Sequence, residues 1–63
     1  MKRTDRRKRE FEAGREEILA AAETIFAARG FHGAAMSEIA AAAGFAVGSL
    51  YRFFAGKEEL YTA

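Results

Sequence analysis

Residues 36–57 constrain the fold of this chain most strongly, because they form a pattern of two short helices joined by a tight turn. Apolar residues fall on one face of each helix, Ile39, Ala40 and Ala43 in the first and Leu50, Phe53 and Phe54 in the second. Gly44 stands where the first helix must stop, at a position that tolerates a left-handed backbone. We therefore predict helices over residues 36–43 and 47–55 that approach each other closely at this turn.

Two such helices crossing at a steep angle are typical of a helix-turn-helix, whose second helix enters the major groove of DNA. The outward face of the predicted second helix carries Val47, Gly48, Tyr51 and Arg52. The hydroxyl of Tyr51 is suited to donate to a phosphate, although the ring could equally pack against the edge of the first helix of the chain. A glycine at position 48 is costly inside a helix, which favours a close approach of another backbone at this point.

Three further polar residues flank this face. Ser37 has a free hydroxyl that either reaches a phosphate or a base edge, or simply faces solvent. Ser49 lies near the start of the second helix, where backbone N–H groups favour a phosphate. Lys57 begins another helix and offers a point charge to a phosphate. Ala35 and Ala46 stand at the two N-cap positions without a side-chain oxygen, so both helices lack the usual cap.

The rest of the chain is predicted to supply the scaffold. A first helix is expected over residues 12–29, because apolar residues recur on one face at Ile18, Ala22, Ile25 and Phe26. Gly30 is expected to end it. His32 follows in a short connector and is expected to be exposed rather than catalytic. The last predicted helix starts at Lys57, and its Leu60 has little apolar surface to bury against.

Charge is distributed unevenly along the chain. Residues 1–9 carry six basic residues against Asp5 and are net +5, whereas residues 10–63 carry four basic residues against eight acids and are net −4. We expect residues 1–11 to form a basic, flexible arm that either tethers the domain to phosphates or serves as a solvated tail. Beside a DNA-reading motif, the first interpretation is favoured.

Composition excludes several other classes. Sixty-three residues form one small domain, and the chain contains no cysteine for a disulfide or a thiolate metal site. No apolar run approaches the roughly 20 residues that span a membrane. No set of side chains has a spacing suited to catalysis, and Glu58 and Glu59 are adjacent and face different directions. We therefore predict no enzyme activity, no catalytic residue, no metal and no cofactor.

The spaced residues also carry a resemblance to a known family. They are Ile18, Leu19, Ala21, Ala22, Phe26, Gly30 and Phe31, then Ile39, Ala40, Ala43 and Gly44, then Gly48, Ser49, Leu50, Tyr51, Phe54, Lys57, Glu58, Glu59 and Leu60. Together they resemble the DNA-binding domain of the TetR (tetracycline-repressor) family. The resemblance covers about residues 15–63 and implies an all-α, three-helix helix-turn-helix domain with the start of a fourth helix. We expect that domain at residues 12–63, with a C-terminal ligand and dimerisation domain absent from this chain.

The resemblance implies roles for the flanking residues. Ser49, Tyr51 and Lys57 match positions that hold phosphates, whereas Ser37, Val47 and Gly48 match positions that approach bases, and Arg52 matches a variable position near the DNA. Ala34 and Ala35 replace the usual threonine pair, Ala46 replaces a serine, and Phe53 replaces a common histidine. Since Ala46, Val47 and Gly48 offer almost no hydrogen bonds, readout is expected through thymine methyl groups, Arg52 and DNA shape.

The resemblance also implies a biological setting, namely a cytoplasmic bacterial repressor that binds a palindromic operator as a homodimer and responds to a small-molecule inducer. A membrane is not an expected partner. The alternative that the residues leave open is a small basic helical module that binds a membrane surface or a protein partner through its arm and an alanine-rich amphipathic helix.

Overall fold

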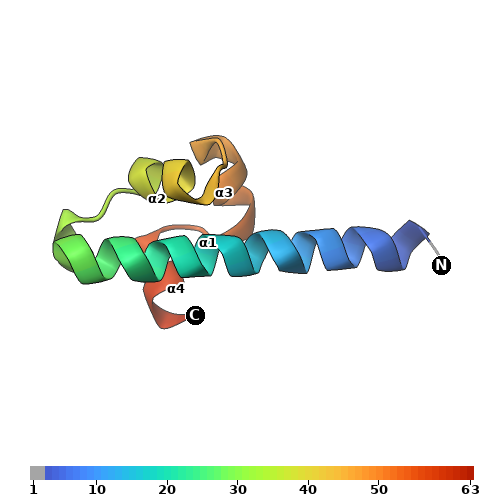
Figure 1. Ribbon diagram of the computed structural model, residues 1–63, viewed down its shortest axis with the longest axis horizontal. Coiled ribbons are helices and arrows are strands. Elements are labelled where there is room, and N and C mark those ends of the chain that lie inside the picture. Colours follow the sequence, from blue (N-terminus) through green and yellow to red (C-terminus); the bar gives the residue numbers. More distant parts are fainter. Residues whose placement is uncertain (1–2) are drawn as a thin grey trace.

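Four helices make up the computed structural model, which describes the backbone of residues 3–63 and the side chains of residues 10–63. They are α1 (Arg3–Gly33), α2 (Met36–Ala43), α3 (Val47–Phe53) and α4 (Lys57–Thr62). The long α1 runs along the whole molecule, and the three short helices pack beside one half of it (Figure 1). The described part of the chain contains no strand, so the all-α prediction is confirmed.

The start of α1 differs from the prediction. The helix begins at Arg3 rather than at Glu12, so the expected flexible arm over residues 1–11 is wrong from Arg3 onward, and residues 1–2 lie outside the described residues. The physical reason is local composition. Residues 3–13 contain neither glycine nor proline and consist mostly of arginine, lysine and glutamate, which are good helix formers.

The far end of α1 follows the prediction at Gly30. This residue has φ 75° and ψ 169°, a backbone conformation that is not helical and is essentially restricted to glycine. A short helical turn from Phe31 to Gly33 follows, where we expected an irregular connector. Gly30 therefore breaks the helical path, and the chain turns back toward α2.

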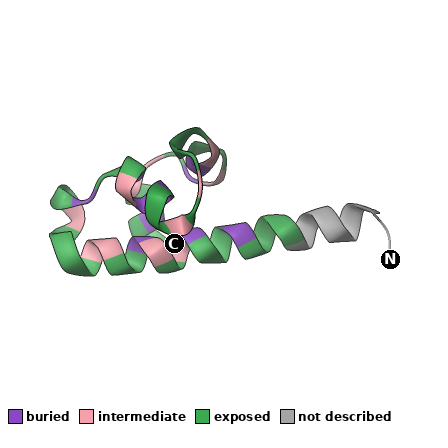
Figure 2. Ribbon diagram, turned by 45° about the horizontal axis from the view of Figure 1, so that its top comes forward, coloured by how far each residue is buried: buried purple, intermediate pink, exposed green. Residues whose placement is uncertain are grey.

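The core lies where the short helices meet α1. Figure 2 shows buried residues on the inner faces of the helices, and those that form the hydrophobic core are Ile18, Ala22, Met36, Ile39, Ala40, Leu50, Phe54 and Leu60. Ile18, Ile39 and Leu50 are fully buried, one from each of the first three helices. Because Ile18 and Ala22 are four residues apart, they share one face of α1 and support both α2 and α4.

Leu60 has more to pack against than the sequence predicted. It is only 3% exposed and belongs to the same core as Ile18 and Ala22. The expectation that Leu60 would remain poorly buried is therefore wrong, because α4 turns back onto α1 after Gly56. A helix of six residues is too short to be stable alone, so this packing is what holds it.

The turn between α2 and α3 has the predicted form. Gly44 has φ 80° and ψ 27°, and its N–H donates to the carbonyl of Ala41 while that of Phe45 donates to the carbonyl of Ala40, 2.8 Å away. This pair of bonds is the Schellman motif, which satisfies the last carbonyls of a helix. As expected, neither Ala35 nor Ala46 forms a side-chain cap.

The helix α3 is shorter than predicted. It ends at Phe53 rather than at residue 55, and Phe54 is already extended with φ −139° and ψ 135°. The extended conformation directs the Phe54 ring into the core, where it is almost fully buried. Burial of this aromatic ring therefore decides where the helix stops.

Candidate nucleic-acid interface

The outer side of α3 forms the surface on which most of the predicted residues meet. Val47 is 42% exposed and Tyr51 is 52% exposed, while Gly48 and Arg52 are also open to solvent. Val47 and Gly48 are each followed four positions later by Tyr51 and Arg52, so the four residues share one face of the helix. This face is opposite the buried Leu50. The structure thus presents a continuous outward face along the whole of α3. We call these four residues the α3 face.

The first turn of the α3 face is apolar and open. Ala46 and Val47 are exposed and carry no hydrogen-bonding side chain. A Cβ atom built on Gly48 would meet no atom within 4 Å, and the backbone of Gly48 has no positive φ. Nothing within the fold therefore requires glycine at this position.

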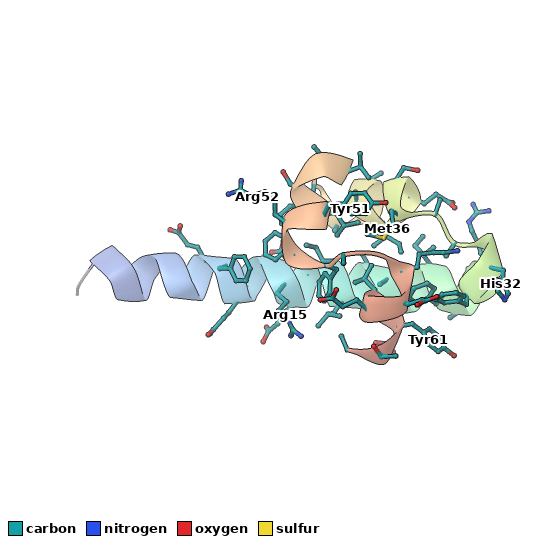
Figure 3. The ribbon with its side chains drawn as sticks, turned by 180° about the vertical axis from the view of Figure 1, so that it is seen from behind. Arg15, His32, Met36, Tyr51, Arg52 and Tyr61 are labelled. Carbon is teal, nitrogen blue, oxygen red and sulfur yellow. The ribbon has the colours of Figure 1, made fainter. Side chains whose placement is uncertain are left out.

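The predicted polar residues beside this face are placed unequally. Ser37 is exposed in the first turn of α2, whereas Ser49 is half-buried near the start of α3. Arg52 extends outward from α3, on the side of the bundle toward which the N-terminal half of α1 runs (Figure 3). Ser37 and Arg52 are thus accessible to a large ligand, and Ser49 only in part.

A surface hollow brings Tyr51 and Lys57 together. Residues from all four helices and from the turn before α4 line it, namely Phe31, Met36, Tyr51, Ala55, Gly56, Lys57, Glu58 and Glu59. Tyr51 and Met36 lie next to each other in Figure 3. The carboxylate Oε2 of Glu59 accepts the backbone N–H of Ala55 at 2.9 Å, so this acid is engaged in holding the start of α4.

Lys57 is engaged more closely than the sequence predicted. Its Nζ donates to the carbonyl oxygen of Phe31 at 2.8 Å and lies 3.5 Å from that of His32. The same nitrogen is 4.8 Å from the centroid of the Phe31 ring. Lys57 therefore joins the start of α4 to the last turn of α1. An ammonium has three donors, so this arrangement leaves capacity for a further acceptor in the hollow.

The ends of α1 and α2 are joined by an ion pair. Nε of Arg29 lies 2.7 Å from Oε2 of Glu38, and both side chains keep substantial contact with solvent. Glu38 stands three residues after the N-cap residue Ala35, where the acid of a capping box would bond the backbone N–H of Ala35, but its carboxylate pairs with Arg29 of α1 instead. An exposed pair of this kind contributes little to stability, so its main effect is on orientation.

Comparison with known proteins decides the family of the chain. Residues 18–63 match the model of the bacterial regulatory proteins of the tetR family. The chain belongs to the tetR family. The predicted resemblance is thereby confirmed, and the chain carries the DNA-binding domain of a transcriptional regulator rather than an enzyme.

Several curated relatives share this domain. The HTH-type transcriptional activator FasR of Mycolicibacterium smegmatis is 47% identical over 49 residues, which are 78% of this chain and 22% of that protein. YdgC of Bacillus subtilis, named an HTH-type transcriptional regulator, is 45% identical over 75% of this chain and 24% of its own length. RutR of Escherichia coli, also named an HTH-type transcriptional regulator, is 40% identical over all of this chain and 30% of its own length. No solved structure matches the chain.

This tetR-family domain holds an aromatic cluster that the sequence reasoning missed. The ring of Phe53 stacks on that of Phe11, with centroids 4.5 Å apart and an interplanar angle of 18°, and meets Phe45 edge-on at 5.8 Å. The sequence predicted Phe53 only as part of the apolar face of residues 47–55, together with Leu50 and Phe54. The available signal was periodicity, since Phe11 and Gly14 continue the face of Ile18 toward the start of α1.

The remaining expectations concern other kinds of site. His32 is exposed and meets the Phe31 ring edge-on at 5.3 Å. Among residues 10–63, no group of three or more histidine, cysteine, aspartate or glutamate side chains is placed to hold a metal. Over the part of the chain that the structure describes, no helix is long and apolar enough to cross a membrane.

Proposed function

We propose that the chain reads DNA by placing α3 in the major groove, as the head of a ligand-responsive repressor. The observation that carries this proposal is the α3 face, which is exposed along its length while Leu50 anchors the helix from behind. A helix presented in this way fits the width of the major groove. The two residues that approach the DNA backbone are Tyr51 and Lys57, which line one hollow at the end of α3.

Sequence readout is proposed to depend on few side chains. Val47 and the open backbone at Gly48 suit contact with thymine methyl groups, and neither donates a side-chain hydrogen bond. Arg52 is the one cation of the α3 face and is able to bind either a guanine edge or a phosphate. Ser37 adds a hydroxyl from the neighbouring helix. The rest of the specificity comes from the shape and deformability of the site.

The regulatory steps are proposed for the whole protein. This chain spans less than a third of the length of the relatives FasR, YdgC and RutR. We propose that residues 12–63 form the DNA-binding unit and that a ligand-binding and dimerising domain belongs to the same protein. Two heads on a dimer then occupy half-sites of a palindromic operator roughly 34 Å apart. A small-molecule inducer changes that spacing, and the setting is the bacterial cytoplasm.

Repression is proposed to follow from occupancy of the operator. One relative, FasR, is named an activator, so membership of the family does not fix the sign of regulation. The proposal of repression is tested by transcription from a template that carries the selected site, with and without the protein. A fall in transcript supports repression, and a rise in transcript overturns it.

DNA binding itself is tested on duplexes selected from a random pool. We expect fluorescence anisotropy to show tighter binding to the selected duplex than to a scrambled one, with an affinity that falls as salt rises. Arg52→Ala is expected to reduce this preference by about tenfold, which corresponds to the loss of one base contact. Arg15→Ala is the charge-matched control, because Arg15 lies on the other side of α1 in Figure 3. Its guanidinium carbon lies 5.4 Å from the centroid of the Phe54 ring, so the melting temperatures of both variants are measured and binding is compared at a temperature where both are folded.

Two outcomes would overturn the proposal. One is equal loss of binding in Arg52→Ala and Arg15→Ala, which would indicate a general charge effect. The other is binding of the chain to vesicles rich in anionic lipid without any binding to duplex DNA. The second outcome would favour the alternative function, a basic helical module for membrane surfaces.

A further inference from the structure

The end of α3 is held against α1 by a clasp of aromatic rings. Phe53 stacks on Phe11 of α1 with ring centroids 4.5 Å apart, and Phe45 meets the Phe53 ring edge-on at 5.8 Å. Phe11 is 50% exposed, so the stack lies at the edge of the bundle rather than in the core. We call these three rings, with Gly14, the aromatic clasp.

Gly14 explains how α1 and α3 approach so closely here. A Cβ atom at this position would lie 3.2 Å from Cζ of Phe53 and 3.3 Å from Cζ of Phe45, closer than ordinary van der Waals contact. Gly14 is buried although it sits within a long helix, where glycine is among the least favourable residues. Its place in α1 is therefore explained by the rings it admits.

The clasp has a consequence for the segment that precedes it. A free helical end of about ten residues is marginal in water without tertiary contacts. Phe11 provides such a contact through its stack on Phe53, one turn ahead of Gly14. The N-terminal part of α1 extends beyond the three short helices (Figure 1). The clasp therefore favours continuation of α1 toward Arg3 and fixes the direction in which it runs.

Charge indicates what this extension meets. Residues 1–9 are net +5 while the remainder of the chain is net −4, so the basic charge is concentrated ahead of the clasp. The clasp residue Phe53 directly follows Arg52, which is exposed on the α3 face. The basic extension thus departs from the edge of the surface proposed to read DNA. A dense cluster of arginine and lysine beside such a surface suits the phosphates of the same duplex.

We propose that the aromatic clasp fixes the basic start of α1 as a helical extension that contacts phosphates of duplex DNA beyond the stretch covered by α3. This inference rests on the proposed function. It differs from a flexible tether in one respect, namely that the contribution of the basic residues depends on Phe11. A polycation on a loose chain keeps its attraction to phosphates whether or not it is held in one direction.

The proposal is tested by combining two changes in the chain. Arg6, Arg7 and Arg9 are replaced by glutamine together, in the Phe11 background and in Phe11→Ala. In the Phe11 background we expect the slope of log affinity against log salt to fall by about 2 to 3, since each phosphate contact contributes about 0.9. In Phe11→Ala we expect the same neutralisation to change the slope by less than half as much. Equal changes in both backgrounds would overturn the proposal.

A second measurement tests the clasp without DNA. The chain has no cysteine, so a double variant with Thr4→Cys and Ala42→Cys carries spin labels at these two positions and nowhere else. We expect a narrow distribution of distances between the labels in the Phe11 and Phe11→Tyr backgrounds and a broad one in Phe11→Ala. Equal widths in all three would overturn the clasp. If no variant binds any duplex while the widths differ as expected, the proposed function fails and the clasp stands without a DNA partner.

Discussion

The ammonium of Lys57 lies 2.8 Å from the carbonyl oxygen of Phe31, across a gap of 26 positions in the chain. The contact ties the start of α4 to the turn that follows Gly30. Lys57 also lines the hollow beside Tyr51. It therefore contributes both to the packing of α4 on α1 and to the surface proposed to bind phosphate. Its two roles are separable by substitution.

Lys57→Met keeps the apolar stem over the Phe31 ring and removes the ammonium. We expect the free energy of unfolding to fall by about 1.5 kcal/mol, at the low end for a charged hydrogen bond because Lys57 is only half-buried. The salt slope of DNA binding is expected to fall by about 0.9, the value for one phosphate. Urea unfolding and anisotropy measure the two effects. Tyr51→Phe is the control for the stability measurement, since it removes a hydroxyl from the same hollow and leaves the bond between Lys57 and Phe31 in place. An unchanged free energy of unfolding in Lys57→Met would contradict the structural role of Lys57.

Gly30 and Gly44 are expected to differ in their tolerance of a side chain. Both have positive φ, but Gly30 lies at ψ 169°, a region essentially closed to other residues, whereas Gly44 is in the ordinary left-handed region. We expect Gly30→Ala to cost about 1–3 kcal/mol and Gly44→Ala about 1–2 kcal/mol. Thermal unfolding of both variants tests this, and an unchanged melting temperature in Gly30→Ala would contradict the backbone assignment.

The parts of the fold that the sequence predicted are those fixed by neighbouring residues. Gly44 ends α2 through a Schellman motif that involves only Ala40 to Phe45, so local chemistry suffices. The buried side of the α3 segment was likewise predictable, because Leu50 and Phe54, the residue that follows α3, are close in sequence. The start of α1 was not predicted, because the dense basic charge of residues 1–9 favours a flexible arm. The helix propensity of the arginine, lysine and glutamate residues there is nevertheless high, and it is this local property that agrees with the structure.

The parts that the sequence missed depend on contacts between distant segments. Phe11 and Phe53 are forty-two positions apart, and no local pattern of either residue indicates the other. Burial of Leu60 depends in the same way on where α4 lies relative to α1. In the candidate site, the exposed residues of α3 were predictable from helical spacing. The partner of Lys57 was not, because the Phe31 carbonyl lies 26 positions away in the chain and meets Lys57 only where α4 packs on α1.

Leu60 is expected to be essential to the stability of this domain. It is nearly fully buried with Ile18 and Ala22, and truncation of a buried leucine to alanine costs about 2–5 kcal/mol. Since a domain of this size has a total stability of roughly 3–5 kcal/mol, Leu60→Ala is expected to be largely unfolded at 25 °C. Circular dichroism at 222 nm measures the loss, and Leu60→Met, which preserves volume, is expected to stay folded. A folded Leu60→Ala would show that α4 contributes little to the core.

Gly48→Ala is expected to separate stability from DNA binding. The position lies in the first turn of α3, has no positive φ, and leaves open space where a Cβ atom would stand. Alanine is a better helix former than glycine, so we expect the free energy of unfolding to rise by about 0.5–1 kcal/mol. For a domain of this size that gain corresponds to roughly 2–8 °C in melting temperature.

The same methyl group of Gly48→Ala stands on the α3 face and is expected to hold the helix away from the base edges. We expect affinity for the selected duplex to fall about tenfold, which is about 1.4 kcal/mol. Gly33→Ala is the matched control, since Gly33 is exposed, has no positive φ, admits a Cβ atom at ordinary van der Waals distance and lies at the end of α1, outside both the α3 face and the hollow. Thermal unfolding and anisotropy on the same samples decide the outcome. The contradicting outcome is a Gly48→Ala variant that is more stable than the parent and binds the selected duplex equally tightly. It would show that DNA does not approach the backbone at Gly48. The proposed contact of the first turn of α3 with thymine methyl groups would then be wrong.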